Sequence, residues 1–239
     1  MGNFETVVGR IRQGLNSGAT AQPHDSASAP QPAALSRAPD SADLQTRFVA
    51  ALSAAGGHPI EAADEAGAAE KIAALLRSIG ARSAAIGGGI TTDSAPITTR
   101  LAEGGCEIMT IRGKDGPAVA ALKQRLSKID AGIVEADYAI AATGTLAVIG
   151  APARPRSLSL IPPTNIVLIS AARIVPNLAA LLAAVGPETI ASHPMVLVTG
   201  PSRTADIEKR IVIGVHGPKE LYVVIVGGSG TTPETAASR

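Results

Sequence analysis

The sequence predicts an α/β protein, a three-layer α/β/α arrangement around a mostly parallel sheet with one inserted β-hairpin. From residue 41 onward, amphipathic helix-like stretches alternate with short apolar runs, which is typical of a parallel sheet covered by helices. In the middle of the chain, apolar runs at 138–142 and 146–149 are separated only by the sequence TGT. Two runs so close together leave no room for a helical crossover, so they predict a hairpin.

The elements follow one another from residue 41. The first expected helix, residues 41–57, has Ser41 as its N-cap, an apolar face that includes Phe48, and a double glycine as its stop. Further helices are expected within 65–81, 94–105, 116–132, 172–186 and 202–214. Strands outside the hairpin are expected within 82–88, 106–113, 165–170, 194–200 and 220–226.

Three parts of the chain differ in composition. Residues 1–40 are expected to hold a short amphipathic helix at 4–15, followed by a flexible arm that is rich in Ser, Ala and Pro and has too little apolar surface to fold. Residues 41–226 are expected to form one α/β domain. Residues 227–239 are expected to be a flexible tail.

The overall composition excludes several classes of function. The chain of 239 residues carries 21 Lys and Arg against 20 Asp and Glu, and it has four aromatic residues, so nothing favours nucleic-acid binding. No segment is long and apolar enough to predict a membrane span or a signal peptide, and we expect a cytoplasmic protein with no membrane contact. A single cysteine, Cys106, can form no internal disulfide and cannot hold an iron-sulfur cluster, and it is expected to be buried as a small apolar residue.

The segment after the strand at 194–200 predicts an anion-binding site. Gly200 turns the chain, and Ser202, Arg203 and Thr204 then stand at the start of the helix expected over 202–214. Free N–H groups, hydroxyls and a guanidinium at a helix N-terminus suit phosphate or carboxylate. The alternative is that a hydroxyl only caps the helix.

The loop GVHGPKEL holds two further candidates, His216 and Lys219. A histidine between two glycines can act as an acid, a base or a hydrogen-bond donor. The helix expected over 202–214 would, however, separate it from Ser202 by roughly 20 Å. A structural role for His216 is therefore the favoured interpretation.

Arg156 follows the hairpin, beside Arg154 and near Ser157 and Ser159, and such a group could clamp a carboxylate or phosphate or simply be solvated. The four histidines are too scattered to predict a zinc site. The run of glycines at 87–92 lacks the spacing of a nucleotide-binding loop and predicts only a tight turn.

The motifs ADYAIAATGTLAV, RPRSLSLIPPTNIVLISAARIVPNL and GPSRTADIEKRIVIGVHGPKEL, in this order, resemble the LUD-domain lactate-utilization family, in its small LutC type. The resemblance implies a fold like that of the NagB/RpiA/CoA-transferase group. It also implies a part in oxidising L-lactate to pyruvate, together with partner proteins of which at least one carries iron-sulfur clusters. The position before TGT is commonly acidic in this family, whereas here it is Ala142, which argues against acid-base catalysis at that point.

We therefore expect a non-redox component of a lactate-utilization system that binds a small anionic ligand. Its ligand-facing groups would be Thr143, Gly144 and Thr145, the segment from Gly200 to Thr204, and Arg156, with His216 and Lys219 as further candidates. No catalytic residue is assigned, and no metal or cofactor is expected. Two alternatives stay open: a transferase or ligase-like enzyme acting on a phosphorylated or CoA-linked substrate, and a structural subunit for the iron-sulfur proteins. The oligomeric state is left open.

Overall fold

The computed structural model describes residues 40–87, 94–111, 119–150, 155–205, 211–213 and 217–227. The expected N-terminal helix and arm, up to residue 39, and the tail from residue 228 lie outside the described residues. His216 and Arg154 also lie outside them.

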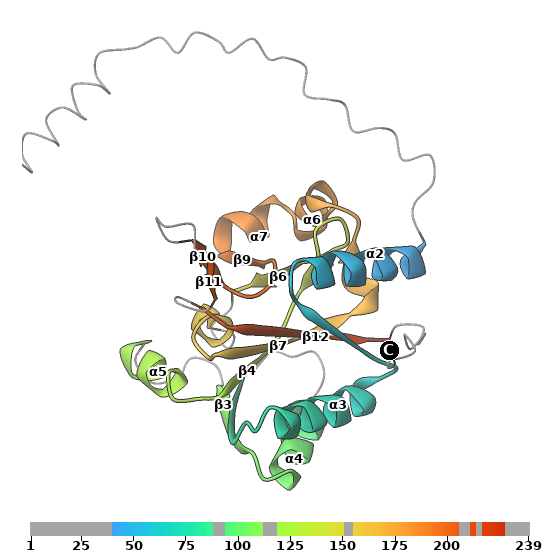
Figure 1. The fold of residues 1–239 in the computed structure, drawn as a ribbon. Helices are drawn as coiled ribbons and strands as arrows, with labels where there is room; N and C mark the ends of the chain where they lie inside the picture. Colours follow the sequence, from blue (N-terminus) through green and yellow to red (C-terminus); the bar gives the residue numbers. More distant parts are fainter. Residues whose placement is uncertain are drawn as a thin grey trace, which may run out of the picture. The chain divides into compact units, whose positions relative to one another are not determined.

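A six-stranded sheet forms the centre of the described structure, and all its neighbouring strands run parallel (Figure 1). In spatial order the strands are β1 (His58–Ala62), β12 (Glu220–Val226), β7 (Thr164–Ser170), β4 (Ala131–Glu135), β2 (Ser83–Gly87) and β3 (Glu107–Ile111). The predicted fold class is therefore confirmed. The sequence did not predict β1, an edge strand that contains Pro59, or β4, a five-residue strand directly after a helix.

Helices cover both faces of this sheet (Figure 1). The helices α3 (Glu65–Ser78) and α4 (Ser94–Glu103) pack on one face, against side chains such as Ile166 and Leu168 of β7. The other face carries α2 (Ser41–Ala54) and α5 (Val119–Leu126), which pack against the alternate residues Val167 and Ile169. Because both faces are buried, the centre of β7, residues 166–169, is a continuous apolar run, and the buried polar residue Asn165 directly precedes it.

A second sheet contains the predicted hairpin. Its order is β8 (Ile174–Val175), β5 (Tyr138–Ile140), β6 (Thr145–Ile149) and β9 (Met195–Val198), and β6 pairs antiparallel with both β5 and β9. The hairpin is therefore confirmed. Helix α6 (Leu178–Val185) packs against this sheet through Leu181, and α7 (Pro187–Ser192) follows it.

Two helix predictions need correction. The segment 202–214 is not a helix, because β10 (Arg203–Ala205) and β11 (Ile211–Ile213) pair antiparallel within it. The β-branched run at 211–213 favours a strand over a helix. Over 172–186 the helix begins only at Leu178, since Pro176 ends β8 and the Asn177 side chain caps α6 by accepting the N–H of Ala180 at 2.9 Å.

The remaining described elements are short. They are the 3₁₀ turns η1 (Arg156–Ser159) and η2 (Ala171–Arg173). None of the helices in the described part of the chain combines the length and apolar character that crossing a membrane requires.

Candidate functional site

The turn of the hairpin is fastened to helix α2. Gly144 has φ of +64°, and a Cβ atom at this position would overlap backbone atoms of Ala51 and Leu52. Glycine is therefore required at position 144 for two reasons: the backbone is left-handed there, and helix α2 lies too close for a side chain. The observed role of Gly144 is to hold the hairpin against α2.

Three threonine hydroxyls form a continuous row beside this turn. The Oγ1 atoms of Thr143 and Thr145 lie 2.7 Å apart, and those of Thr145 and Thr199 also lie 2.7 Å apart. Thr145 is only 6 % exposed and stands in the middle of the row. The row connects the turn to the end of β9, where Thr199 was not predicted as a site residue.

The C-terminal end of α2 is closed by the segment that follows β9. Arg203 donates from Nη2 to the carbonyl oxygen of Ala55 at 3.1 Å, a favourable place for a cation because carbonyl groups and the negative end of the helix dipole meet there. Gly200 has φ of +84°, and a Cβ atom on it would overlap the same carbonyl oxygen. Part of the hydrogen-bonding capacity of Arg203 therefore serves the fold.

The loop around Ser202 lies against the loop that precedes β12. The N–H of Ser202 donates to the carbonyl oxygen of Pro218 at 2.9 Å. A Cβ atom on Gly217 would come within 2.9 Å of the Cβ of Ser202. The predicted separation of roughly 20 Å between these two loops is therefore wrong, because β10 and β11 fold the intervening segment back on itself. His216 lies outside the described residues, but its neighbour Gly217 contacts Ser202.

A cavity of about 180 Å³ lies between these loops and the amino ends of β7 and β12. Its apolar side is formed by β9, Leu160 and Leu221, and its polar side by serine, threonine and asparagine side chains. The described lining residues are Ser159, Leu160, Asn165, Val196, Leu197, Val198, Thr199, Gly200, Ser202, Gly217, Pro218 and Leu221. Leu160 and Leu197 are both more than 40 % exposed, so the cavity opens to solvent beside them.

Asn165 is the most unusual group in this cavity. It is 1 % exposed, and among the described residues neither its Nδ2 nor its Oδ1 atom has a hydrogen-bond partner. Leaving such a buried amide unpaired costs about 1–3 kcal/mol for each polar group. A buried amide that lines a cavity and has no partner in the described part of the chain is a group that a ligand can satisfy.

The strand neighbours of Asn165 leave room for the polar side of the cavity. Asn165 lies opposite Gly132 of β4 on one side and opposite Leu221 of β12 on the other. A Cβ atom on Gly132 would overlap the carbonyl oxygen of Leu158, so only glycine lets the turn η1 lie so close to the sheet. This approach brings Ser159, which is 2 % exposed, to the cavity, with its Oγ donating to the carbonyl oxygen of Arg156 at 3.0 Å.

The structure brings only part of the predicted site together at the cavity. Gly200 and Ser202 line it, and Thr145 reaches it indirectly through Thr199. The described lining includes neither the turn residues Thr143 and Gly144 nor Arg156, Arg203 and Lys219. Thr204 lies on β10, and its side chain is outside the described part.

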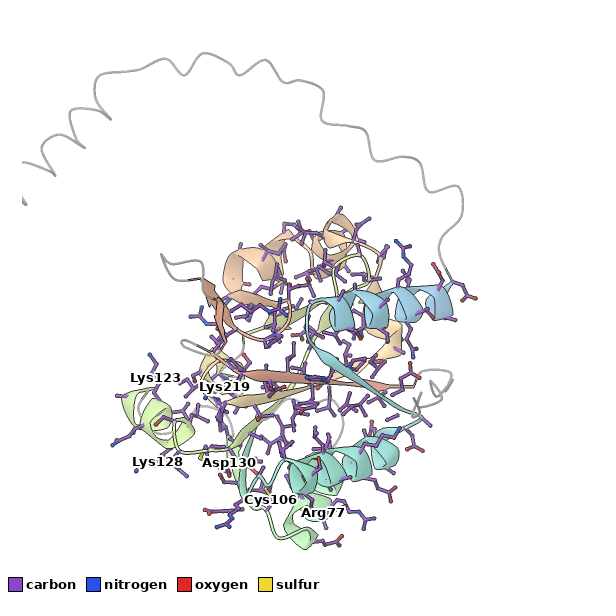
Figure 2. All side chains as sticks on the ribbon, in the orientation of Figure 1. Arg77, Cys106, Lys123, Lys128, Asp130 and Lys219 are labelled. Carbon is purple, nitrogen blue, oxygen red and sulfur yellow. The ribbon has the colours of Figure 1, made fainter. Side chains whose placement is uncertain are left out.

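The described lining of the cavity carries no charged residue, but two lining residues are each followed in the sequence by a cationic residue. Arg203 comes after Ser202, and Lys219 comes after Pro218. Both side chains are exposed, and Figure 2 shows Lys219 at the start of β12. Their chain neighbours Ser202 and Pro218 line the cavity, while neither charged side chain belongs to the described lining.

A second, larger cavity of about 300 Å³ lies at the carboxyl ends of β4 and β7. Its polar lining includes Glu135, Asp137, Ser170 and Arg173. The Asp137 carboxylate accepts the N–H of Ile149 at 2.6 Å, so it braces the hairpin and does not share a pocket with the TGT turn. Arg173 donates from Nη1 to the hydroxyl of Tyr138 at 3.2 Å.

The perturbed titratable groups of the described part do not line either cavity. Burial raises the pKa of the Cys106 thiol, and the negative charges of Asp130 and Glu107 raise it further. Burial alone would raise the pKa of Asp130, but hydrogen bonds from Arg82 and Ser83 outweigh it, so this pKa is lowered. Figure 2 shows Cys106 and Asp130 in the same region of the molecule.

The described residues form an α/β protein with a cavity at the amino edge of its parallel sheet. The sequence model of the LUD domain matches residues 45–226, which is most of the chain. The chain therefore belongs to the LUD-domain family, as its motifs predicted.

Individual relatives agree with this assignment. The chain is 31 % identical over 170 residues to the protein YkgG of Escherichia coli K12, a match that covers 69 % of this chain and 72 % of that one. It is 34 % identical over 110 residues to lactate utilization protein C of Halalkalibacterium halodurans, a match that spans 44 % of this chain and 47 % of that protein.

A solved structure supports the fold. The crystal structure of a DUF162 family protein from Deinococcus radiodurans matches with a TM-score of 0.60 at 22 % identity, and the match covers 79 % of this chain and 99 % of that one.

Proposed function

We propose that this chain is a non-redox component of an L-lactate-utilization system and that it binds a small anionic ligand in the cavity beside Asn165. Relatives named lactate utilization protein C support the first half of the proposal. One observation supports the second half. Three segments that lie far apart in the sequence, within 159–165, 196–202 and 217–221, each contribute residues to a single cavity, and among them is a buried amide that has no hydrogen-bond partner in the described part of the chain.

The chemistry of the cavity suits a short carboxylic acid. The hydroxyls of Thr199 and Ser202 and the Asn165 amide can donate hydrogen bonds to a carboxylate, while Leu160 and Leu221 offer contacts to a methyl group. Arg203 and Lys219 supply positive charge nearby. The volume of about 180 Å³ favours a ligand of the size of lactate or pyruvate over a nucleotide.

In this proposal, partner proteins transfer the electrons that are released when lactate is oxidised. A chain with one cysteine cannot hold an iron-sulfur cluster, so clusters would belong to companion proteins. Under this proposal the system works in the cytoplasm, and the chain supplies a ligand site to it.

Isothermal titration of the full chain with L-lactate, pyruvate, CoA and ATP tests the binding half. We expect saturable heat with at least one of the two short acids. Ser202→Ala and Thr199→Val should each weaken binding about tenfold, because each removes one hydrogen bond to the ligand. Arg125→Ala on α5, an exposed cation outside the cavity, is the matched control and should leave the affinity unchanged.

Growth tests the physiological half. A bacterial host that lacks its own copy of this chain should lose growth on L-lactate and keep growth on pyruvate, and the wild-type gene should restore it. The Ser202→Ala gene should restore growth less well than the Arg125→Ala gene. Full restoration by a variant that no longer binds either acid would favour the assembly-subunit alternative and contradict the ligand site.

A second candidate function is favoured by the cavity at the carboxyl ends of β4 and β7. Open α/β sheets commonly bind substrates at this edge, and a carboxylate such as Glu135 can act as a nucleophile. This position suits a transferase or ligase-like enzyme with a NagB/RpiA/CoA-transferase-like fold. Turnover of acyl-CoA or phosphorylated substrates by the purified chain, lost in Glu135→Gln, would support it, and no turnover across such a panel would reject it.

A further inference from the structure

We infer that Asn165 selects a 2-hydroxy acid over the corresponding 2-oxo acid in the amino-end cavity. This inference rests on the proposed function, since it names the ligand that the same cavity prefers. The amide of Asn165 presents one donor group, Nδ2, and one acceptor, Oδ1, and both are buried and unpaired. A ligand that satisfies both atoms must itself offer an acceptor and a donor.

A 2-hydroxy acid and the corresponding 2-oxo acid differ in this respect, because only the hydroxy acid carries a hydroxyl that can donate. L-lactate offers a carboxylate that accepts from Nδ2 and a hydroxyl that donates to Oδ1. Pyruvate and propionate are nearly the same size, but as anions they have no donor, so Oδ1 would stay buried without a partner. Sites built around a buried polar group reject analogues that leave it unpaired.

The described surroundings of Asn165 offer its amide no hydrogen-bond partner. Its two strand neighbours on the sheet are Gly132, which has no side chain, and Leu221, which is apolar. Ser159, a buried hydroxyl in the cavity lining, already donates its proton to the carbonyl oxygen of Arg156 and cannot also donate it to Oδ1. Within the described structure, the register of the sheet and the position of η1 therefore leave Oδ1 without a donor.

An unpaired buried amide also destabilises the empty protein. Asn165→Leu replaces it with an apolar side chain of similar volume, which should be neutral or stabilising in the absence of ligand. A purely structural asparagine would behave in the opposite way, because its replacement would remove hydrogen bonds and lower the melting temperature. The Leu variant therefore remains folded, and its binding data can be interpreted.

The experiment titrates the full-length wild type and Asn165→Leu with L-lactate, pyruvate and propionate, and records the thermal midpoint of each protein without ligand. We expect wild type to bind L-lactate about tenfold or more tightly than either other acid. In Asn165→Leu this preference should fall to about twofold or less, with an equal or higher midpoint. Ile166→Leu, a volume-conserving change at the next residue of β7, whose side chain packs on the opposite face of the sheet and outside the described lining, is the control that should keep the preference.

The outcomes separate this inference from the proposed function. Equal binding of all three acids by wild type, or an unchanged preference in Asn165→Leu, overturns the selection by Asn165 and leaves the ligand site intact. Failure of all three acids to bind wild type overturns the ligand site itself, and the inference falls with it. A clearly lowered midpoint in Asn165→Leu would show that the amide has a structural partner, which also overturns the inference.

Discussion

Gly144 at the tip of the hairpin lies directly against the backbone of Leu52 in α2, closer than any side chain would allow. This relationship joins the TGT motif to the first helix of the domain. The threonines on either side of Gly144 continue the same function through the hydroxyl row that ends at Thr199. The TGT motif therefore does not line the cavity itself, but it supports Thr199, which does.

Gly144→Ala should destabilise the protein by about 3 kcal/mol, because it adds left-handed backbone strain to an overlap with α2. Urea unfolding of the variant and the wild type measures the difference. Gly80→Ala is the matched control: Gly80 has φ of +70° but open space around its Cα, so we expect a loss of only about 1 kcal/mol. Equal losses in the two variants would show that Gly144 is required for its φ angle alone.

Thr145→Val should lower the free energy of unfolding by about 1–2 kcal/mol, because it removes the central hydroxyl of the row while keeping the shape of the side chain. Thr143→Val, at the exposed end of the row, should cost about 0.5 kcal/mol or less. Urea unfolding checks both values. If the two variants lose the same stability, the row does not act through its buried member.

Much of the fold could be predicted from local patterns. The helices α2 and α3 show a clear apolar face with stop signals, β7 and β12 are continuous apolar runs, and the spacing of the two runs around TGT leaves only a hairpin. The strand β4 could not be predicted, because AGIVE has too few residues to distinguish a buried strand from the end of a helix. Over 202–214 the hydroxyl and acidic residues are of the types that commonly begin a helix, so the sequence predicted one. The strands β10 and β11 form instead because they pair with each other, and that pairing cannot be recognised from local helix propensity.

The candidate site could be predicted only in part for a similar reason. The loops of Gly200 and Ser202 were found because their residue types suit anions. Asn165 is the single polar residue in the sequence NIVLI, so it is visible in the sequence. Its unpaired position at the cavity, however, depends on the strand register that places Gly132 and Leu221 beside it. Register between strands that are distant in the sequence is set by the whole sheet and leaves no local signal.

Asp130 should make stability depend on acid pH. Its Oδ2 atom accepts the N–H groups of Arg82 and Ser83 and the hydroxyl of Ser83, each at 2.9 Å, which fastens the start of β4 to the start of β2. Because the folded-state pKa of Asp130 is lowered, its contribution is present above the unfolded value of about 3.9 and is lost as the pH falls through the folded value.

Asp130→Asn should therefore cost about 1–2 kcal/mol at pH 7, and the difference from wild type should shrink as the pH falls below about 4. Urea unfolding at pH 7, 5, 4 and 3 measures it. Asp43→Asn is the control, since the exposed Asp43 has only a 3.8 Å ion pair with Arg47 and should change stability by less than about 0.5 kcal/mol. A difference that grows towards low pH would contradict the assignment.

Cys106 should react slowly with iodoacetamide, because burial and the charges of Asp130 and Glu107 raise its pKa and the thiolate is the reacting form. In the folded chain the alkylation rate should keep rising beyond pH 8.5, the ordinary value of a free cysteine. Asp130→Asn and Glu107→Gln each remove one negative charge, so each should lower the pKa of Cys106 and speed alkylation at pH 8 by a few fold. Glu107 is exposed, whereas the carboxylate of Asp130 accepts three hydrogen bonds that its replacement would disturb, so Glu107→Gln is the cleaner variant. In 8 M urea all three chains should react alike, and a folded-state rate that levels off below pH 8.5 would contradict the raised pKa.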